Sequence, residues 1–421
     1  MIETVRNAWK IPDLRKKLLF VLFAIVVFRF GHAIYVPYVD TAALAASFAA
    51  RNSANLLGYF NVLSGGGLAT ASIFALSIYP YINSSIIVQL LQVSIPALER
   101  VAKDEGEEGK KKLQRITRYG TLVLAVLMAT GYYIMIRSMG VLTRSDIWAA
   151  IVIITTFVAG AMFVVWLGDQ ITEKGIGNGI SVILLAGIVS QGYGALMKVI
   201  SMPWWAAIIV LIVCILIIAF IIYITEGERR IPVQYAKRVV GRKQYGGQSS
   251  NLPMKVNMSG VMPVIFASTI CGVPATLIGF FGNAQTSKMV GEKGWFTQGS
   301  VVYIIVYVLL IFAFAYFYSA IQFNPIEVAN NLKKNGGFIP GFRPGKPTSD
   351  FIAKVLNKIT MMGAIFLAII AGLPLILSNV PGLLGLAIGG TSTMIMVGVV
   401  LETIRAIESE MMMRHYKGFL E

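Results

Sequence analysis

Charged residues are scarce in this chain. Asp, Glu, Lys and Arg together make up 13% of its 421 residues, about half of their share in an average soluble domain. The mean hydropathy of +0.73 indicates that most of the chain has lipid rather than water as its solvent. These two values exclude a soluble globular enzyme and predict a polytopic membrane protein.

Histidine and cysteine are nearly absent, with His32, His415, Cys214 and Cys271 as the only examples. Both cysteines lie in apolar runs far from a histidine, so neither a zinc site nor a disulfide framework is expected. The sequence also lacks the nucleotide-binding, zinc-protease and serine-hydrolase motifs. The glycine-rich residues 175–179 lack the following lysine of a phosphate loop, and we interpret them as a tight turn that caps the next helix. We therefore predict no cofactor, no metal and no enzymatic activity.

Long stretches without charge are abundant, and each stretch of about 20 residues predicts a membrane-spanning helix. Six stretches give one span each, namely 118–137, 146–169, 174–198, 198–226, 255–288 and 293–327, and a seventh span starts at Lys17 and extends past Arg29 to Val39. The stretch 359–401 is twice as long and divides at the turn signal 378–382 into two spans. With a further span at about 78–95, the sequence predicts an all-α protein with ten transmembrane helices.

A cluster of glycines interrupts the remaining long stretch, 52–98. Ser64 and the glycines 65–67 leave a half-helix, 68 to about 77, that is too short to cross a membrane. Irregular backbone at membrane depth survives only where protein buries it or where it lines a water-filled cavity. The glycine break therefore points to a channel or a transporter.

Basic residues outnumber acidic ones, 36 to 20, and they concentrate before the first span and after spans 2, 6 and 8. By the positive-inside rule, both termini and the even-numbered loops are cytoplasmic. We interpret 1–17 as a cytoplasmic segment and the first span as a retained helix, not a cleaved signal peptide.

Two cytoplasmic loops, 226–257 and 324–358, combine basic residues with tyrosine, phenylalanine, glycine and proline. Attraction to anionic lipids would explain the charge alone. The interleaved aromatic residues and prolines favour ordered hairpins that dock on an acidic partner, such as ribosomal RNA or an acidic groove of a protein.

Six short segments between residues 60 and 334 carry a resemblance to a known family, and the match covers nearly the whole chain. The segments are 60–66 (FNVLSGG), 71–76 (ASIFAL), 80–82 (PYI), 175–181 (GIGNGIS), 255–263 (KVNMSGVMP) and 330–334 (NNLKK). In these segments the chain resembles the bacterial SecY family, the channel subunits of the Sec protein translocon.

The resemblance implies two pseudo-symmetric, inverted halves around an hourglass pore. They would comprise residues 18–198 (spans 1–5) and 199–405 (spans 6–10), followed by a cytoplasmic tail, 406–421. The glycine break, about 64–72, would be a plug, made of Ser64, Gly65, Gly66, Gly67, Leu68, Ala69, Thr70 and Ala71.

The same resemblance implies a ring of aliphatic residues at the pore constriction. Carried over residue by residue, the ring consists of Ile82, Ile86, Ile180, Leu184, Ile265 and Ile395, where Leu184 departs from the usual isoleucine. A lateral gate between spans 2 and 7 would involve Ile87, Leu90, Leu91, Thr269 and Val273.

The resemblance also implies partners and a location. SecE and SecG would be membrane subunits, and the SecA ATPase or the ribosome would supply the driving energy by docking on Arg238, Arg242, Lys243 and Arg343. Signal peptides, translocating polypeptides and anionic lipids would be further partners, in the bacterial plasma membrane.

A secondary transporter for a small solute is the alternative, because transporters also use inverted repeats and broken helices. It predicts a polar cage near the break, where the sequence offers only Asn83, Ser84 and Ser85. An intramembrane protease would need a serine–histidine or paired-aspartate site within the spans. The sequence contains only two histidines, which argues against this class of protein.

Overall fold

The computed structural model describes residues 2–50, 61, 64–104, 106–201, 203–235, 238–240, 243–245, 249–281, 300–377 and 390–417. The chain divides into two compact units. Unit 1 comprises 1–203, 272–300 and 399–421, and unit 2 comprises 204–271 and 301–398.

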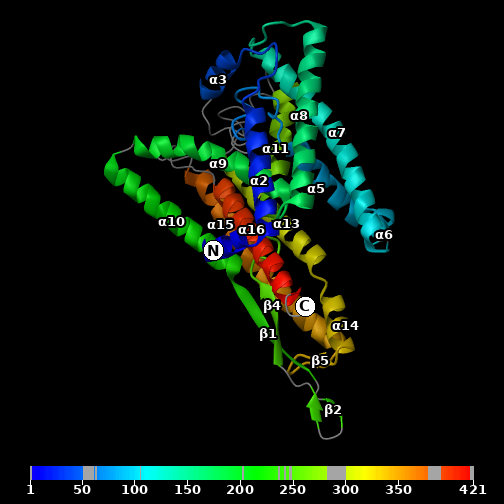
Figure 1. The fold of residues 1–421 in the computed structure, drawn as a ribbon. Helices are drawn as coiled ribbons and strands as arrows, with labels where there is room; N and C mark the ends of the chain where they lie inside the picture. The colour runs from blue at the N-terminus through cyan, green and yellow to red at the C-terminus, as the bar shows by residue number, and fades with distance from the viewer. Residues whose placement is uncertain are drawn as a thin grey trace. The chain divides into compact units, whose positions relative to one another are not determined.

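Unit 1 is helical in the part of it that the structure describes (Figure 1). Its helices are α1 (Ile2–Lys10), α2 (Pro12–His32), α3 (Thr41–Ala50), α5 (Tyr79–Ser94), α6 (Pro96–Asp104), α7 (Gly106–Ser138), α8 (Ile147–Lys174) and α9 (Gly179–Ile200). Two further helices, α11 (Met262–Phe281) and α16 (Gly390–Lys417), are divided between the units.

Unit 2 combines helices with a small sheet. Its helices are α10 (Trp204–Glu226), α13 (Val301–Gln322), α14 (Pro325–Lys334) and α15 (Lys346–Leu377). Its strands are β1 (Glu228–Tyr235), β2 (Arg238–Val240), β3 (Lys243–Tyr245), β4 (Ser249–Lys255) and β5 (Gly337–Phe338). Strand β1 lies between β4 and β5 and is antiparallel to both.

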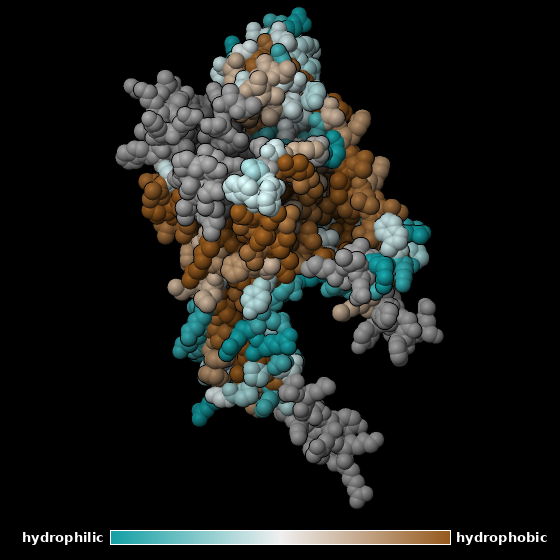
Figure 2. Space-filling model, turned by 90° about the vertical axis from the view of Figure 1, so that its left-hand side faces the viewer, coloured by the Kyte–Doolittle hydropathy of each residue, from teal (hydrophilic) through white to brown (hydrophobic). Residues whose placement is uncertain are grey.

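A helix lies over each of the ten predicted spans. Five helical segments of the described chain are long and apolar enough to cross a membrane, namely 106–138, 147–174, 204–226, 301–334 and 346–372. Figure 2 shows hydrophobic side chains gathered over the helices of the face in view. Such exposed apolar surface fits lipid as the solvent, and the count of ten spans stays a prediction.

The turn between α8 and α9 has the form that the sequence predicted. Gly177 has a φ of +77°, a conformation that glycine adopts at little cost. The Asn178 side chain then accepts hydrogen bonds from the backbone N–H groups of Ile180 (3.1 Å) and Ser181 (3.5 Å). Asn178 is therefore the N-cap of α9, and the interpretation of 175–179 as a capping turn is confirmed.

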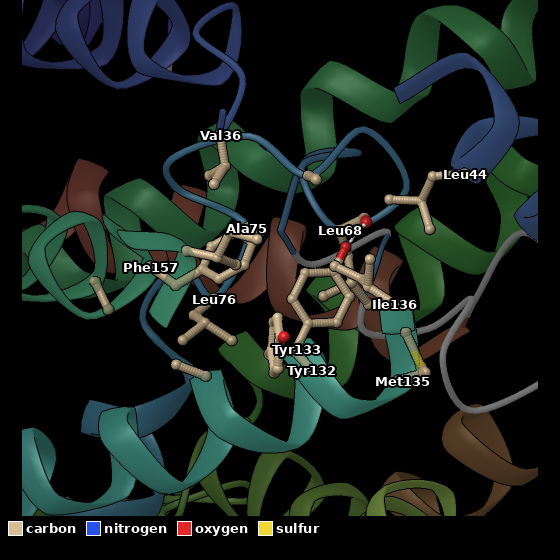
Figure 3. Close-up of a cluster of buried hydrophobic side chains, with 14 of the residues drawn as sticks. Val36, Leu44, Leu68, Ala75, Leu76, Tyr132, Tyr133, Met135, Ile136 and Phe157 are labelled. Carbon is tan, nitrogen blue, oxygen red and sulfur yellow. Dashed lines mark hydrogen bonds between the residues drawn. The ribbon is translucent and has the colours of Figure 1, made fainter. Parts of the chain in front are cut away.

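One buried cluster of unit 1 packs side chains of α7 and α8 against the segment that precedes α5 (Figure 3). Tyr132 and Ile136 of α7, Phe157 of α8 and Leu76 are all buried. The rings of Tyr132 and Phe157 lie 5.1 Å apart. The same cluster includes Leu68 and Ala71 of the glycine break, so the break packs against α7 and α8.

Candidate functional site

The glycine break is a buried, irregular stretch of backbone. We call residues 64–71 the glycine segment. Residues 64–70 are turns, and the segment is followed by further turns up to α5. Ser64 and Ala71 are 1% and 0% exposed, although neither lies in a helix or strand. The segment therefore needs hydrogen-bond partners other than those of regular structure.

The prediction of a half-helix at 68–77 is wrong, because the structure has turns there. Gly65, Gly66, Ala71 and Ser77 all have φ values between +45° and +90°. A right-handed helix requires negative φ at every residue, so Ala71 and Ser77 interrupt any helix within 68–77, and Gly65 and Gly66 interrupt the backbone just before it.

Glycine is required within the segment because neighbouring atoms approach its backbone closely. A Cβ atom on Gly67 would lie 2.6 Å from Ser72 Oγ and 3.0 Å from His32 Cδ2. A Cβ atom on Gly66 would lie 2.5 Å from Gln191 Nε2. A side chain at Gly67 would therefore have to displace Ser72 or His32, and the φ of +90° at Gly66 strains any residue other than glycine.

Side chains from three helices direct polar atoms at the carbonyl oxygens of the segment. His32 Nε2 of α2 lies 2.5 Å from Ser64 O, and Tyr132 of α7 donates its hydroxyl to Leu68 O. Gly65 O accepts longer contacts, both 3.4 Å, from Arg29 Nη1 of α2 and Ser190 Oγ of α9.

Sequence reasoning missed His32, Tyr132 and Ser190 as neighbours of the glycine segment. The carbonyl oxygens that they face occur at every residue, so no sequence motif marks the acceptors. The available signal was weaker, namely polar side chains that lie within apolar spans.

Four of the predicted ring residues belong to unit 1. Ile82 and Ile86 are buried on α5, and Leu184 is buried on α9, while Ile180 is half-buried. The four-residue spacing within each pair places its members on one face of their helix. The other two, Ile265 and Ile395, are buried in unit 2. The pore ring of six aliphatic residues stays a prediction.

The predicted gate residues on α5 are less buried than the ring residues on the same helix. Ile87 and Leu91 are 46% and 40% exposed, and Leu90 is half-buried. On α11, Thr269 is buried and Val273 is exposed. The gate between the two helices stays a prediction.

Of the predicted docking residues, Arg343 has an exposed side chain, and its carbonyl oxygen accepts a 2.8 Å hydrogen bond from Thr348 Oγ1. Arg238 and Lys243 lie in the paired strands β2 and β3. Arg242 lies outside the described residues.

No group of three metal-ligating side chains occurs within the described ranges. Cys271 is buried and Cys214 is half-buried, and both are free thiols.

Comparisons with known proteins agree on one family. The SecY family model matches residues 72–404. A protein translocase subunit SecY from Streptomyces scabiei is 41% identical over 437 residues, which cover 100% of both chains. One from Rickettsia conorii is 42% identical over 420 residues, covering 97% of this chain and 96% of the relative.

Solved structures agree with this fold. A structure of a protein-conducting channel has a TM-score of 0.66 and 18% identity, and a SecY structure reported for its plug domain has a TM-score of 0.68 and 18% identity. Each covers 96% of both chains. The family model and the full-length identity to curated relatives lead to one conclusion: this chain is a membrane protein of the SecY family.

Proposed function

We propose that this chain forms a protein-conducting channel that passes unfolded secretory polypeptides across the bacterial plasma membrane. The observation that carries the proposal is the glycine segment: irregular backbone that is buried among apolar helices and flanked by buried aliphatic residues on α5. Such backbone is tolerated at membrane depth where protein buries it or where it lines an aqueous path. In this proposal, residues 64–71 are the plug.

The aliphatic ring suits a channel for polypeptides. Side chains of every chemistry must pass, and polar groups in the pore would hold some of them and slow the rest. Ile82, Ile86 and Leu184 are branched and apolar, so they yield sterically and leave no water path when they close. Together with Ile180, Ile265 and Ile395, they would form the constriction.

Sideways release into lipid follows from the hydrophobic effect. A signal sequence or a nascent transmembrane helix prefers hydrocarbon to water in proportion to its apolar area. The exposed Ile87 and Leu91 on α5 and Val273 on α11 offer an apolar surface to such a segment. These residues, with Leu90 and Thr269, would form the lateral gate.

The driving energy comes from outside the chain in this proposal. The sequence contains no phosphate-binding motif, so SecA or a translating ribosome would dock on the basic residues of the loops at 226–257 and 324–358. A Sec61 channel has been solved in a canine ribosome–channel complex, and it resembles this chain with a TM-score of 0.61 and 17% identity. SecE and SecG would complete the membrane complex, with anionic lipids around the basic loops.

The orientation places both termini in the cytoplasm. Reporter fusions after Lys17 and after Arg144 test it, since the first residue lies in a basic segment and the second in a loop with few basic residues. We expect cytoplasmic activity at Lys17 and external activity at Arg144. The reverse pattern would contradict the orientation.

Photocrosslinking tests the channel itself. A photoreactive residue replaces Ile86, and in a control variant it replaces Ile183, which is buried on α9 outside the proposed ring. A secretory precursor is then stalled during export. We expect an adduct with the precursor at position 86 and none at 183. No adduct at any ring position, with precursor engagement verified, would contradict the channel and favour a transporter of a small solute.

A further inference from the structure

The glycine segment is held through its backbone. Side chains outside the segment place polar atoms within hydrogen-bond distance of three of its carbonyl oxygens, those of Ser64, Gly65 and Leu68. The donors come from α2, α7 and α9 of unit 1. These contacts connect residues 64–68 of the segment to three separate helices.

The imidazole of His32 is fixed in its orientation. Its Nδ1 lies 2.9 Å from Phe28 O one helical turn earlier, while Nε2 faces Ser64 O. The rings of Phe28 and Phe74 contact the imidazole edgewise, with centroids 4.5 and 5.8 Å away. The side chain is 8% exposed, so its rotamer is set by packing before it meets the segment.

The phenol of Tyr132 is fixed in the same way. Its side chain is 1% exposed and packs on Phe157, and its hydroxyl donates to Leu68 O (Figure 3). If the segment moved away, a buried hydroxyl and a backbone carbonyl would each lose a partner. Unsatisfied buried polar groups are unfavourable, so this bond opposes displacement.

The other two donors contribute less. Arg29 is exposed and its contact with Gly65 O is 3.4 Å long. Ser190 Oγ makes a shorter contact of 2.6 Å with Gly187 O of its own helix, and its 3.4 Å contact with Gly65 O is secondary. Tyr132 and His32, the latter with its single proton on Nε2, are therefore the two strong side-chain donors.

We infer that His32 and Tyr132, supported by Arg29 and Ser190, form a carbonyl latch that holds the glycine segment in the sealed position. The inference rests on the proposed channel function, because it gives these positioning residues control over how often the seal opens. Loss of one donor shifts the equilibrium towards the open state and leaves the transport path intact. The chain would then leak ions at rest and still pass a precursor.

The test uses the full chain with its co-purifying subunits in vesicles of phosphatidylethanolamine and phosphatidylglycerol. Tyr132→Phe removes one hydroxyl, and His32→Leu removes both ring nitrogens. The matched control is Tyr133→Phe, because Tyr133 lies in the same buried cluster and makes no hydrogen bond to the glycine segment among the described residues. His32→Gln tests rescue, since the glutamine amide can place an N–H near the position of Nε2.

Two quantities are measured without precursor. The first is resting ion flux across the vesicle membrane. The second is hydrogen exchange of the backbone amides of Gly66, Leu68 and Ala69, whose N–H groups are hydrogen-bonded to Asn61 and Ser64. We expect both to rise about five-fold in Tyr132→Phe and at least as much in His32→Leu. Tyr133→Phe and His32→Gln should stay within about two-fold of the unmodified chain.

The difference in hydrogen exchange between the latch variants and Tyr133→Phe is the deciding result. Unchanged exchange in both Tyr132→Phe and His32→Leu would overturn it, as would an equal rise in Tyr133→Phe. Hydrogen exchange of the backbone amides in strand β1 serves as the folding control, because a misfolded variant would show faster exchange in β1 as well. Transport of a precursor by the unmodified chain tests the channel function separately, because hydrogen exchange in the glycine segment is measured without a precursor.

Discussion

Arg118 of α7 and Asp169 of α8 form an ion pair with 2.7 Å between Nη2 and Oδ2. The two partners differ in environment, because the Asp169 side chain is 11% exposed and that of Arg118 is 46% exposed. The carboxylate therefore depends on its partner for stabilisation more than the guanidinium does.

This asymmetry predicts unequal effects of two substitutions. Arg118→Gln leaves a largely buried carboxylate without its cation and should lower the free energy of unfolding by about 2 kcal/mol. Asp169→Asn should lower it less, because water already solvates much of Arg118. Thermal unfolding in detergent measures both, and the double substitution should recover part of the loss. Equal losses in the two single variants would contradict the prediction.

Gly160 of α8 packs directly against the backbone before α5, where a Cβ atom would lie 2.0 Å from the carbonyl oxygen of Ile73. Gly160→Ala should therefore displace that backbone and destabilise the fold by about 1–3 kcal/mol. The matched control is Gly192→Ala on α9, where nothing lies within 4 Å of the added Cβ. Melting temperatures measure the difference. Equal melting temperatures for the two variants would contradict the prediction.

Ser77 combines two unfavourable features. Its φ is +46°, and its hydroxyl is buried without a hydrogen-bond partner among the described residues. Ser77→Gly removes both and should raise the free energy of unfolding by up to about 1 kcal/mol. Ser77→Ala removes the hydroxyl but keeps the strained backbone, so it should be the less stable of the two. A more stable alanine variant in thermal unfolding would count against the argument.

Arg343 offers an exposed positive charge in the loop at 324–358. In the proposed docking surface, Arg343→Glu should weaken binding of an acidic partner about ten-fold and reduce the salt dependence of that binding. Arg144→Glu makes the same change in a loop that the charge pattern places on the opposite side, and it should leave binding unchanged. Sedimentation with ribosomes at two salt concentrations measures both. Similar losses in the two variants would indicate a non-specific charge effect.

The span helices could be predicted from the sequence because their signal is local. A run of apolar residues between charges leaves few alternatives to a helix in lipid, and a helix lies at each predicted position. The cap at Asn178 could also be predicted, since glycines and an asparagine before an apolar run form a known turn.

The conformation of the glycine break could not be predicted. Ala71 and Ser77 have positive φ, which is unusual for residues other than glycine, and only tertiary packing imposes it. The hydrogen bond from Tyr132 to Leu68 O joins residues 64 positions apart. Its acceptor is a backbone oxygen, so the sequence contains no complementary residue that would reveal the pair.

The sequence predicts ordered hairpins in the loops at 226–257 and 324–358, and the structure joins the two loops in one sheet. Strand β5 from the second loop pairs with β1 from the first, through Gln234 with Phe338 and Tyr235 with Gly337. Ile231, Val233 and Ile339 are buried in one cluster with residues of α15. Partners this far apart in the sequence give no local signal.

That pairing has a mechanical consequence. The seven residue pairs of β1 and β4 begin at Glu228 and Lys255, directly after α10 and shortly before α11. With β5 attached, the sheet is a stiff arm rooted in several helices (Figure 1). A load on either loop would therefore be shared by both loops, because β1 cannot move without β4 and β5 unless their backbone hydrogen bonds break.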